Sequence, residues 1–515
     1  MNFKPVSHIG GPLQLLGWLA LVLLIKHDHL LSPPAWDSVM GVFPPAVFLA
    51  ENDFNLILLV QQADWWQGGP NVHSLSLFTW LVAAAMAITR DPQLTFLLLH
   101  GLTFLLTALS LWWYTRLLTS LDVDAVPSHL AALTLLVCPL VLDQVERLNT
   151  EIPLMACHVG VALLLCRQNH LAAALVAVTA LAIKLTAVAL VAGLSLVLLA
   201  GLPRYPKKNA IALTLLIVGS CFILLLPMLV GSTTMRPGGW GDSALLLKQL
   251  ELRLESVPDI TQLMKLAIIA ALVLPFWWWY QGRGGKQHAS WSAPAFFVLL
   301  VPVLFALGVI VGAHRGNLFL PRYAVAVLPL VLGSVVLLCR EFLPRYVLTA
   351  LIGICAIAFA LNHNGRYYPP NQDSFSVVER SLAYREFNGV KQNAISALVQ
   401  RYPAIPAFVT RELHYMNSSR YMGYVDPVHP ATFPVFIEPY RGWQLDEYPE
   451  QFVLLKGSTI HGGRVIDRLV RAARESTTHQ VSEERFESSG FSATLFHIQR
   501  LDQGGVETAL GMIMH

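Results

Sequence analysis

Carboxylates and cations recur in the polar segments between the apolar runs of this chain. The acids include Asp37 and Glu151, and the cations include Lys184, Arg315 and Arg322. A carboxylate can take the proton of an acceptor hydroxyl or amine, and Lys and Arg can stabilise a phosphate leaving group. If both sets lie on one face of a membrane, their chemistry is group transfer from a lipid phosphate.

Each of these residues also has a plainer interpretation. Asp37 could cap a short helix that begins at Ser38. Glu151 could complement the dipole at the start of a helix, and Arg322 with Tyr323 could form an interfacial anchor. A single charge at a membrane interface is often only solvated. The combination of the charges on one face therefore carries the functional prediction.

Three further polar or aromatic residues are candidates for contact with an acceptor or a sugar. Asp143 lies in the same polar connection as Glu151, or is the exit residue of the preceding span. Trp66 could stack on a sugar, although an interfacial aromatic belt explains the Trp65-Trp66 pair equally well. His73 has either a structural role or a place beside the substrate.

The composition is typical of a polytopic membrane protein. Of the 515 residues, 55% are hydrophobic and 13% are charged, whereas soluble proteins carry about 25% charged residues. A net charge of +3 gives no reason to expect a nucleic-acid partner. The six cysteines lie in or beside apolar runs without a CxxC pair, so a cysteine zinc site is not expected.

The apolar runs predict an all-α membrane domain. A full helical span needs about 20 residues, and several of these runs are shorter. The runs cover residues 11–26, 75–89, 94–117, 128–143, 152–166, 170–183, 186–201, 209–230, 264–280, 291–312, 322–339 and 344–362.

Lys and Arg in the short connections predict the orientation. Basic residues open the connections that begin directly after residues 115, 166, 203, 282 and 339. We place these connections in the cytoplasm together with the N-terminus. Connections 27–73, 144–151, 231–263 and 313–321 then face outward. This alternation holds only if the 75–89 run, followed by Arg90-Asp91-Pro92, is re-entrant or interfacial. About 11 transmembrane helices plus juxtamembrane helices remain.

The apolar stretch 170–201 contains one lysine, Lys184. A lysine at the bilayer centre is costly. Two short helices that turn at Lys184 would place its ammonium at the outer surface. Alternatively, one long tilted helix would let Lys184 reach the interface along its own side chain.

Charged and turn residues return after residue 362, so we divide the chain into domains 1–362 and 363–515. Strand-like runs at Ala407–Thr410, Gln451–Lys456 and Ala493–Ile498 accompany helical patterns at Ala394–Arg401 and Gly463–Glu475. This alternation predicts a small C-terminal α/β domain on the outer side.

Residues 10 to 362 resemble the GT-C superfamily of polytopic glycosyltransferases, in the branch of protein O-mannosyltransferases and lipid A aminoarabinose transferases. Five motifs match in order: Trp36-Asp37 after the first span, Asn71-Val72-His73-Ser74-Leu75, Cys138-Pro139-Leu140 through Glu151-Ile152-Pro153, Ile183-Lys184-Leu185-Thr186, and Pro321-Arg322-Tyr323 to Leu328-Pro329-Leu330. The chain lacks the prolines of the family's His-Pro-Pro-Leu, and Glu151 stands where Asp is more common.

The resemblance implies inverting transfer, on the outer face, from a polyprenyl-phosphate sugar donor to a glycolipid, polysaccharide or protein acceptor. Carried over, Asp37 is the catalytic base and Glu151 the second acidic group. Lys184 and Arg322, or Arg315, contact the donor phosphate. The basic cytoplasmic connections and the absence of cysteines from the C-terminal domain fit a bacterial inner (plasma) membrane, with an archaeal or ER membrane as the alternative. The C-terminal domain would then lie in the periplasm or outside the cell.

Two other classes of membrane protein remain open. A transporter or flippase for an anionic lipid-linked sugar would use the same outer cations, but its paired inverted repeats are not evident. An oligosaccharide polymerase or ligase usually places its functional loop later in the chain. We expect no cofactor and no metal, because cations replace the metal at a monophosphate donor; a divalent cation is the alternative for a pyrophosphate.

Overall fold

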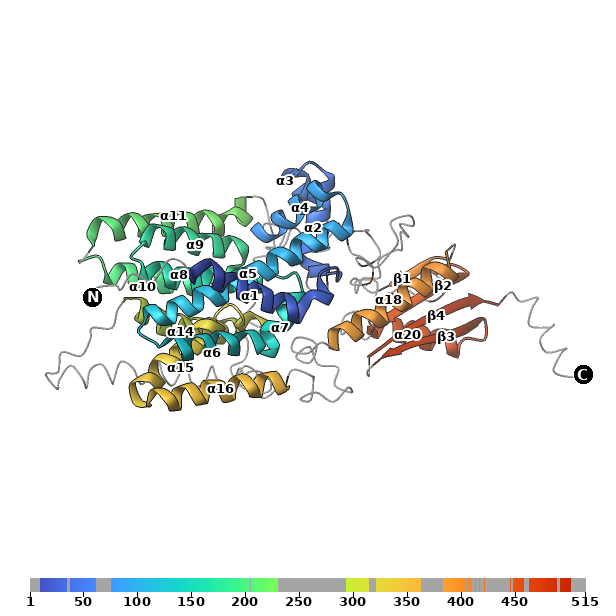
Figure 1. Ribbon diagram of the computed structural model, residues 1–515. Helices are drawn as coiled ribbons and strands as arrows, with labels where there is room; N and C mark the ends of the chain where they lie inside the picture. Colours follow the sequence, from blue (N-terminus) through green and yellow to red (C-terminus); the bar gives the residue numbers. More distant parts are fainter. Residues whose placement is uncertain are drawn as a thin grey trace, which may run out of the picture.

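The structure is a computed structural model with a helical part and a smaller part built on a sheet (Figure 1). It describes residues 10–34, 38–61, 76–203, 205–229, 293–314, 321–362, 383–403, 405–409, 448–457, 463–488 and 491–501, together with residues 413, 416, 421 and 445.

Apolar helices and short 3-10 or π-helical turns form the helical part. In chain order they are α1 (Gly10–Lys26), η1 (His27–His29), η2 (Ser38–Val42), α2 (Phe43–Glu51), α3 (Leu56–Gln61), α4 (Leu77–Thr89), α5 (Pro92–Ser120), α6 (Ala125–Val137), α7 (Pro139–Glu146), α8 (Glu151–Cys166), α9 (His170–Ile183), η4 (Leu185–Ala187), α10 (Val188–Ala200), α11 (Pro206–Leu229), α14 (Ala293–His314), η5 (Pro321–Ala324), α15 (Leu328–Phe342) and α16 (Arg345–Asn362).

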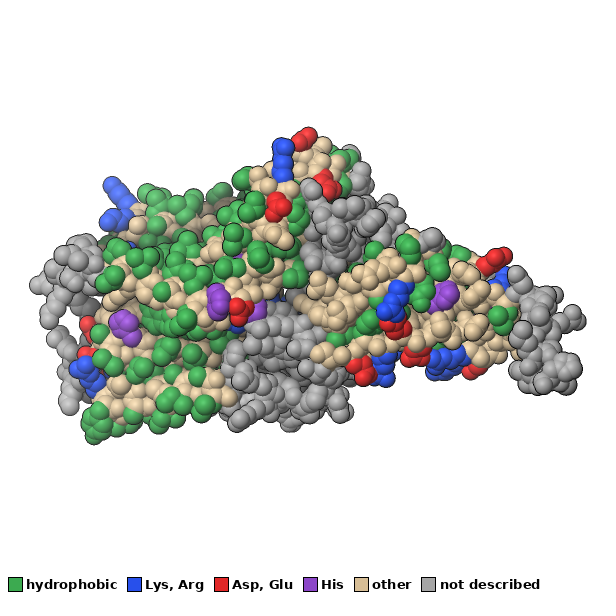
Figure 2. Space-filling view, turned by 45° about the vertical axis from the view of Figure 1, so that its right-hand side comes forward, with side chains coloured by type: hydrophobic (Ala, Val, Ile, Leu, Met, Phe, Trp, Pro, Cys, Tyr) green, Lys and Arg blue, Asp and Glu red, His purple; other side chains and the backbone are tan. Residues whose placement is uncertain are grey.

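The outer surface of the helical part is mainly hydrophobic (Figure 2). Large apolar side chains are exposed at helical spacing, as at Leu13 and Leu24 of α1 and at Ile354 and Ile357 of α16. Soluble proteins rarely expose extended apolar surface. This surface is therefore suited to contact with lipid.

Two helices in the described part of the chain are long and apolar enough to cross a membrane, Pro92–Ser120 and Pro206–Leu225. The bent pair α6 and α7 would make a third. Shorter apolar helices, such as Leu77–Thr89 and His170–Ile183, have 10 to 17 residues, which at 1.5 Å per residue fall short of a 30 Å hydrocarbon core. The structure therefore does not confirm about 11 spans, and the predicted run 264–280 lies outside the described residues.

The helical part has two chemically different ends. One end carries α7 and lies nearest the sheet in Figure 1; we call it the α7 end. At the opposite end, Arg340 donates to the carbonyl of Leu121, and Arg345 pairs with Asp124 at 2.9 Å. Exposed Lys207 also lies there, at the start of α11.

The start of α4 is bonded to the α7 end. Ser76 caps α4 and donates its hydroxyl to the carbonyl of Ile183, the last residue of α9. The next helix, α5, begins on the same side, because His100 in its third turn lies 2.9 Å from the carbonyl of Ser32, beyond the end of α1. The helix from the 75–89 run thus returns to the side on which it starts.

Lys184 separates two antiparallel helices. Its backbone is extended, with φ −161° and ψ 137°. Asn209 contacts His170 at the start of α9 and also donates to Leu198 near the end of α10, so those two helix ends lie together. The hairpin expected at Lys184 is confirmed, and the single long helix is wrong.

The C-terminal part is a three-layer arrangement around a four-stranded sheet. Its elements are α18 (Ala383–Arg401), β1 (Ala407–Val409), β2 (Gln451–Gly457), α20 (Gly463–Glu475), β3 (His479–Ser488) and β4 (Phe491–Arg500). The strand order is β1-β2-β4-β3, with β1 parallel to β2 and the other neighbours antiparallel.

Alternate side chains of β2 pack on opposite faces of the sheet, because the side chains of a strand have a two-residue period. Phe452 and Leu454 pack with Ile466 of α20, whereas Val453 and Leu455 lie in the core that includes Leu398 of α18. The predicted strands and the Gly463–Glu475 helix are confirmed, and α18 begins earlier than expected. The sequence reading missed β3, whose Ser482 to Arg485 stretch is strongly charged.

Candidate functional site at the corner between α7 and α8

A sharp corner in the chain positions the candidate site. Pro139 disfavours a helical residue before it, and Cys138 is extended, so α6 and α7 meet at 60°. The chain turns again after α7, where Leu148 has a positive φ of 49°. Asn149 then accepts the backbone N–H of Thr150 at 2.8 Å, directly before α8 begins at Glu151.

Glu151 gathers two cations from distant parts of the sequence. Lys184 Nζ donates to Glu151 Oε1 at 2.5 Å, and Arg322 Nε lies 3.7 Å from the same oxygen. The hydroxyl of Thr150 donates to Glu151 Oε2 at 2.9 Å. The side chain of Glu151 is 1% exposed and that of Lys184 is 10% exposed. We call Glu151, Lys184 and Arg322 the Glu151 cluster.

Tyr323 adds an aromatic face to the Glu151 cluster. Its ring centroid lies 4.2 Å from Lys184 Nζ and 5.3 Å from Arg322 Cζ. An aromatic face attracts a cation without neutralising it. The ring therefore holds the two cations close while leaving their charge available.

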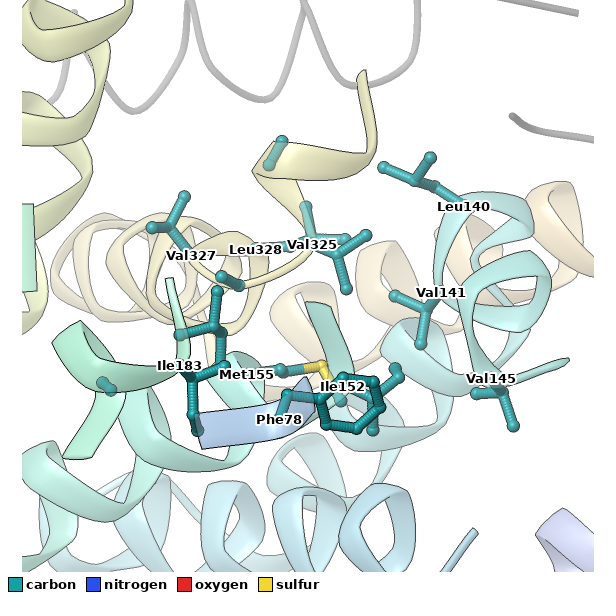
Figure 3. Close-up of a cluster of buried hydrophobic side chains, with 14 of the residues drawn as sticks. Phe78, Leu140, Val141, Val145, Ile152, Met155, Ile183, Val325, Val327 and Leu328 are labelled. Atoms are coloured by element: carbon teal, nitrogen blue, oxygen red, sulfur yellow. The ribbon is translucent and has the colours of Figure 1, made fainter. Parts of the chain in front are cut away.

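Apolar side chains surround this polar group. Figure 3 shows the buried hydrophobic cluster beside it, to which α4, α7, α8, α9 and the η5–α15 segment contribute. Met155 and Ile152 come from the first turns of α8, and Val325 follows η5 directly. Charges are stronger partners where water is excluded, so the surroundings strengthen the electrostatic interactions of the cluster.

A second charged group lies on the other side of the corner. Glu146 at the end of α7 pairs with Lys26, and His29 Nε2 lies 3.4 Å from the same carboxylate oxygen. Asp143 is bound within its own helix by Arg147, whose Nη2 is 2.9 Å from both carboxylate oxygens. Asp143 is therefore next to the corner, and its contacts with Arg147 and Gln144 do not involve the Glu151 cluster.

Charged side chains are concentrated at this end. In the described part of the helical region, the cations Lys26, Arg147, Lys184 and Arg322 lie near the acids Asp143, Glu146 and Glu151.

The structure brings together three of the residues singled out in the sequence, Glu151, Lys184 and Arg322. Four others lie outside the described residues: Asp37, Trp66, His73 and Arg315. The nearest described neighbour of Asp37 in the chain is Ser38, whose hydroxyl donates to the carbonyls of Arg147 at 2.8 Å and Leu148 at 3.2 Å.

Sequence reading missed two buried cations, Lys26 and Arg147. One signal could have found Lys26: it is a lysine at the predicted outer end of a span, where the distribution of basic residues is unfavourable. Arg147 stands four residues after Asp143, the spacing at which opposite charges meet on a helix.

A scan against models of known protein families finds no match to this chain, and a search of curated proteins finds no matching sequence. Among the described residues, no three His, Cys, Asp or Glu side chains are grouped so that they could hold a metal ion. The expectation of a metal-independent reaction stays a prediction.

Proposed function

We propose that this protein is an integral-membrane glycosyltransferase of the GT-C type. It transfers a sugar from a polyprenyl-phosphate donor to a glycolipid, polysaccharide or protein acceptor on the outer face. One observation carries the proposal: Lys184 and Arg322, which are 138 positions apart in the sequence, meet at the buried carboxylate of Glu151 beside an apolar wall. Two cations at a lipid-compatible site are suited to a lipid phosphate.

The charge of the site favours a monophosphate donor. A sugar phosphodiester carries a single negative charge, which Lys184 and Arg322 can contact directly. A pyrophosphate would bring more negative charge to the same two cations and would more often call for a metal. A donor with one phosphate therefore fits best.

In the proposed reaction, Asp37 is the base. The acceptor oxygen or nitrogen attacks C1 of the sugar as the Asp37 carboxylate takes its proton. The bond between C1 and the phosphate oxygen breaks, and polyprenyl phosphate leaves with the electron pair. Lys184 and Arg322 stabilise the charge on that oxygen, and attack from the opposite face inverts the anomeric centre. The contacts of Ser38 with residues 147 and 148 support a place for its neighbour near this corner.

The membrane arrangement belongs to the same proposal. We infer about 11 crossings, with α4 as a helix that does not cross, since its start is bonded to Ile183 and the helix that follows it begins on the same side. The α7 end faces outward and the end with Arg340, Arg345 and Lys207 faces the cytoplasm. The C-terminal part then lies in the periplasm or outside the cell, with the protein in the inner or plasma membrane.

Replacement of the proposed base tests the function. The protein in lipid nanodiscs is incubated with a panel of radiolabelled polyprenyl-phosphate sugars and an outer-membrane glycolipid fraction as acceptor, and labelled product is measured. Asp37→Asn should lower kcat at least about 100-fold, because general-base catalysis supplies 10²–10⁴ in rate.

Asp28→Asn is the matched control, because Asp28 is exposed and pairs with His27, which is also exposed. This control should retain wild-type activity. Full activity of Asp37→Asn would remove Asp37 as the base. Movement of the labelled donor across the bilayer without any transfer product would instead favour a flippase.

A further inference from the structure

The charged group around Glu146 has no part in the chemistry proposed above, although it lies at the same corner. Lys26 ends α1, His29 lies in η1 and Glu146 ends α7, and all three side chains are buried. Lys26 and His29 contact the same oxygen of Glu146. The carboxylate therefore joins the end of α1 to the end of α7.

The chain that follows α1 is held at further points. His29 Nδ1 lies 3.4 Å from the hydroxyl of Ser32, and His100 Nε2 of α5 lies 2.9 Å from the carbonyl of Ser32. With its ring proton on Nε2, His29 donates a hydrogen bond to the Glu146 carboxylate, and its Nδ1 accepts the hydroxyl hydrogen of Ser32. With the bonds of Ser38 to residues 147 and 148, the described parts of segment 26–38 are attached to α5, to α7 and to the loop after α7.

A buried ion pair in this position sets the relative placement of the two helix ends more than it stabilises the fold. Hydrophobic residues of similar volume often stabilise a protein as well as a buried ion pair does. Directional bonds to one carboxylate, however, fix where α1 ends relative to α7. Glu146 stands five positions before Glu151, so the same corner that carries the Glu151 cluster also holds segment 26–38.

We propose that Glu146 is a positioning residue: by binding Lys26 and His29, it holds residues 27–34, which follow α1, in register with the Glu151 cluster. As a statement about catalysis, this rests on the proposed function, because residues 27–34 precede the proposed base in the chain. As a statement about structure, it requires only that the attachment through Glu146 limits the opening of segment 26–34.

The test removes the ion pair without leaving an unpaired charge. The double variant Lys26→Met with Glu146→Gln keeps both side-chain volumes, whereas a single Glu146→Gln would bury an unpaired lysine. Hydrogen–deuterium exchange of the full chain in nanodiscs is followed for peptides covering residues 27–34 and, as an internal reference, α9. In the double variant, the 27–34 amides should exchange at least about tenfold faster, with α9 unchanged. In the transfer assay, kcat should fall at least about tenfold while the donor KM stays within about threefold.

Two further variants make the result specific. Lys26→Arg keeps a cation beside Glu146 and should retain slow exchange of residues 27–34. Arg345→Met with Asp124→Asn removes an ion pair at the opposite end of the helical part and should alter neither the exchange of residues 27–34 nor kcat.

Unchanged exchange in the Lys26→Met, Glu146→Gln variant would overturn the proposal, whatever the activity. Faster exchange with an unchanged kcat would overturn its catalytic half. If the wild-type protein transfers no sugar, the proposed function fails, and the exchange rates still decide whether Glu146 holds the segment.

Discussion

At the scale of single residues, the site is defined by one carboxylate with two cations. Glu151 is fully buried and receives Lys184, Arg322 and the hydroxyl of Thr150. Breaking a buried ion pair by removing one partner typically costs 3–5 kcal/mol, so these charges depend on one another. Glu151 keeps the two cations close together, where a phosphate can bind to both.

Lys184→Met should weaken binding of sugar-free polyprenyl phosphate by about ten- to a hundredfold. The substitution removes a charge-assisted hydrogen bond, which is worth roughly 1.5–3 kcal/mol. Binding is measured by native mass spectrometry of the protein in nanodiscs. Lys207→Met makes the same change on an exposed lysine at the opposite end and should bind the lipid as the wild type does. Equal affinity of the Lys184 and Lys207 variants would contradict the phosphate site.

At the scale of elements, helix ends and helix contacts place these residues. Pro139 breaks the path between α6 and α7, and the extended Lys184 ends α9. The hairpin of α9 and α10 is then held by close helix packing. A Cβ on Gly193 of α10 would lie 2.6 Å from Val301 Cγ2 of α14, so only glycine allows these two helices to approach as closely as they do.

Gly193→Ala should destabilise the protein by about 1–3 kcal/mol, the usual cost of overfilling a packed interior. Thermal unfolding of the detergent-solubilised protein measures the loss. Gly308→Ala, on α14 itself, is the matched control because no atom lies within 4 Å of its added Cβ; it should leave stability unchanged or slightly higher. Val301→Ala should partly restore the stability of Gly193→Ala. A neutral Gly193→Ala would show that α10 and α14 do not pack this closely.

At the scale of the whole molecule, the decisive property is sidedness. The α7 end, which holds the Glu151 cluster, lies nearest the sheet (Figure 1), and exposed Lys207 and Lys208 of α11 lie at the opposite end. In the proposed arrangement, the basic end faces the cytoplasm. An outward active site would thus share its compartment with the C-terminal part.

Cysteine labelling of intact cells tests this orientation. In a variant whose six cysteines are replaced by serine or alanine, Gln480→Cys on exposed β3 should react with a membrane-impermeant maleimide. Lys207→Cys, exposed at the start of α11, should react only after the inner membrane is opened. Bacterial cells with a permeabilised outer membrane provide the assay. The reverse pattern would place the site in the cytoplasm and remove the proposed outward transfer.

The sequence by itself determined most of the apolar helices and three of the four described strands. Hydropathy marked the helices, strand-like runs marked β1, β2 and β4, and Lys184 marked a turn because a charge is costly in the bilayer centre. The number of membrane crossings could not be derived from the sequence, because apolar runs of 10 to 17 residues can cross the bilayer, enter and leave it on one side, or lie at its interface.

Only the tertiary structure decided which charges meet. From the sequence, Asp143 and Glu151 were equal candidates. In the structure, Asp143 pairs with Arg147, four residues further along the chain, whereas Glu151 pairs with Lys184 and Arg322 from distant elements. The structure also brings Lys26 to Glu146, 120 positions away. The physical reason is that a side chain's partner depends on how helices pack and where corners turn, and those contacts come from residues far apart in sequence.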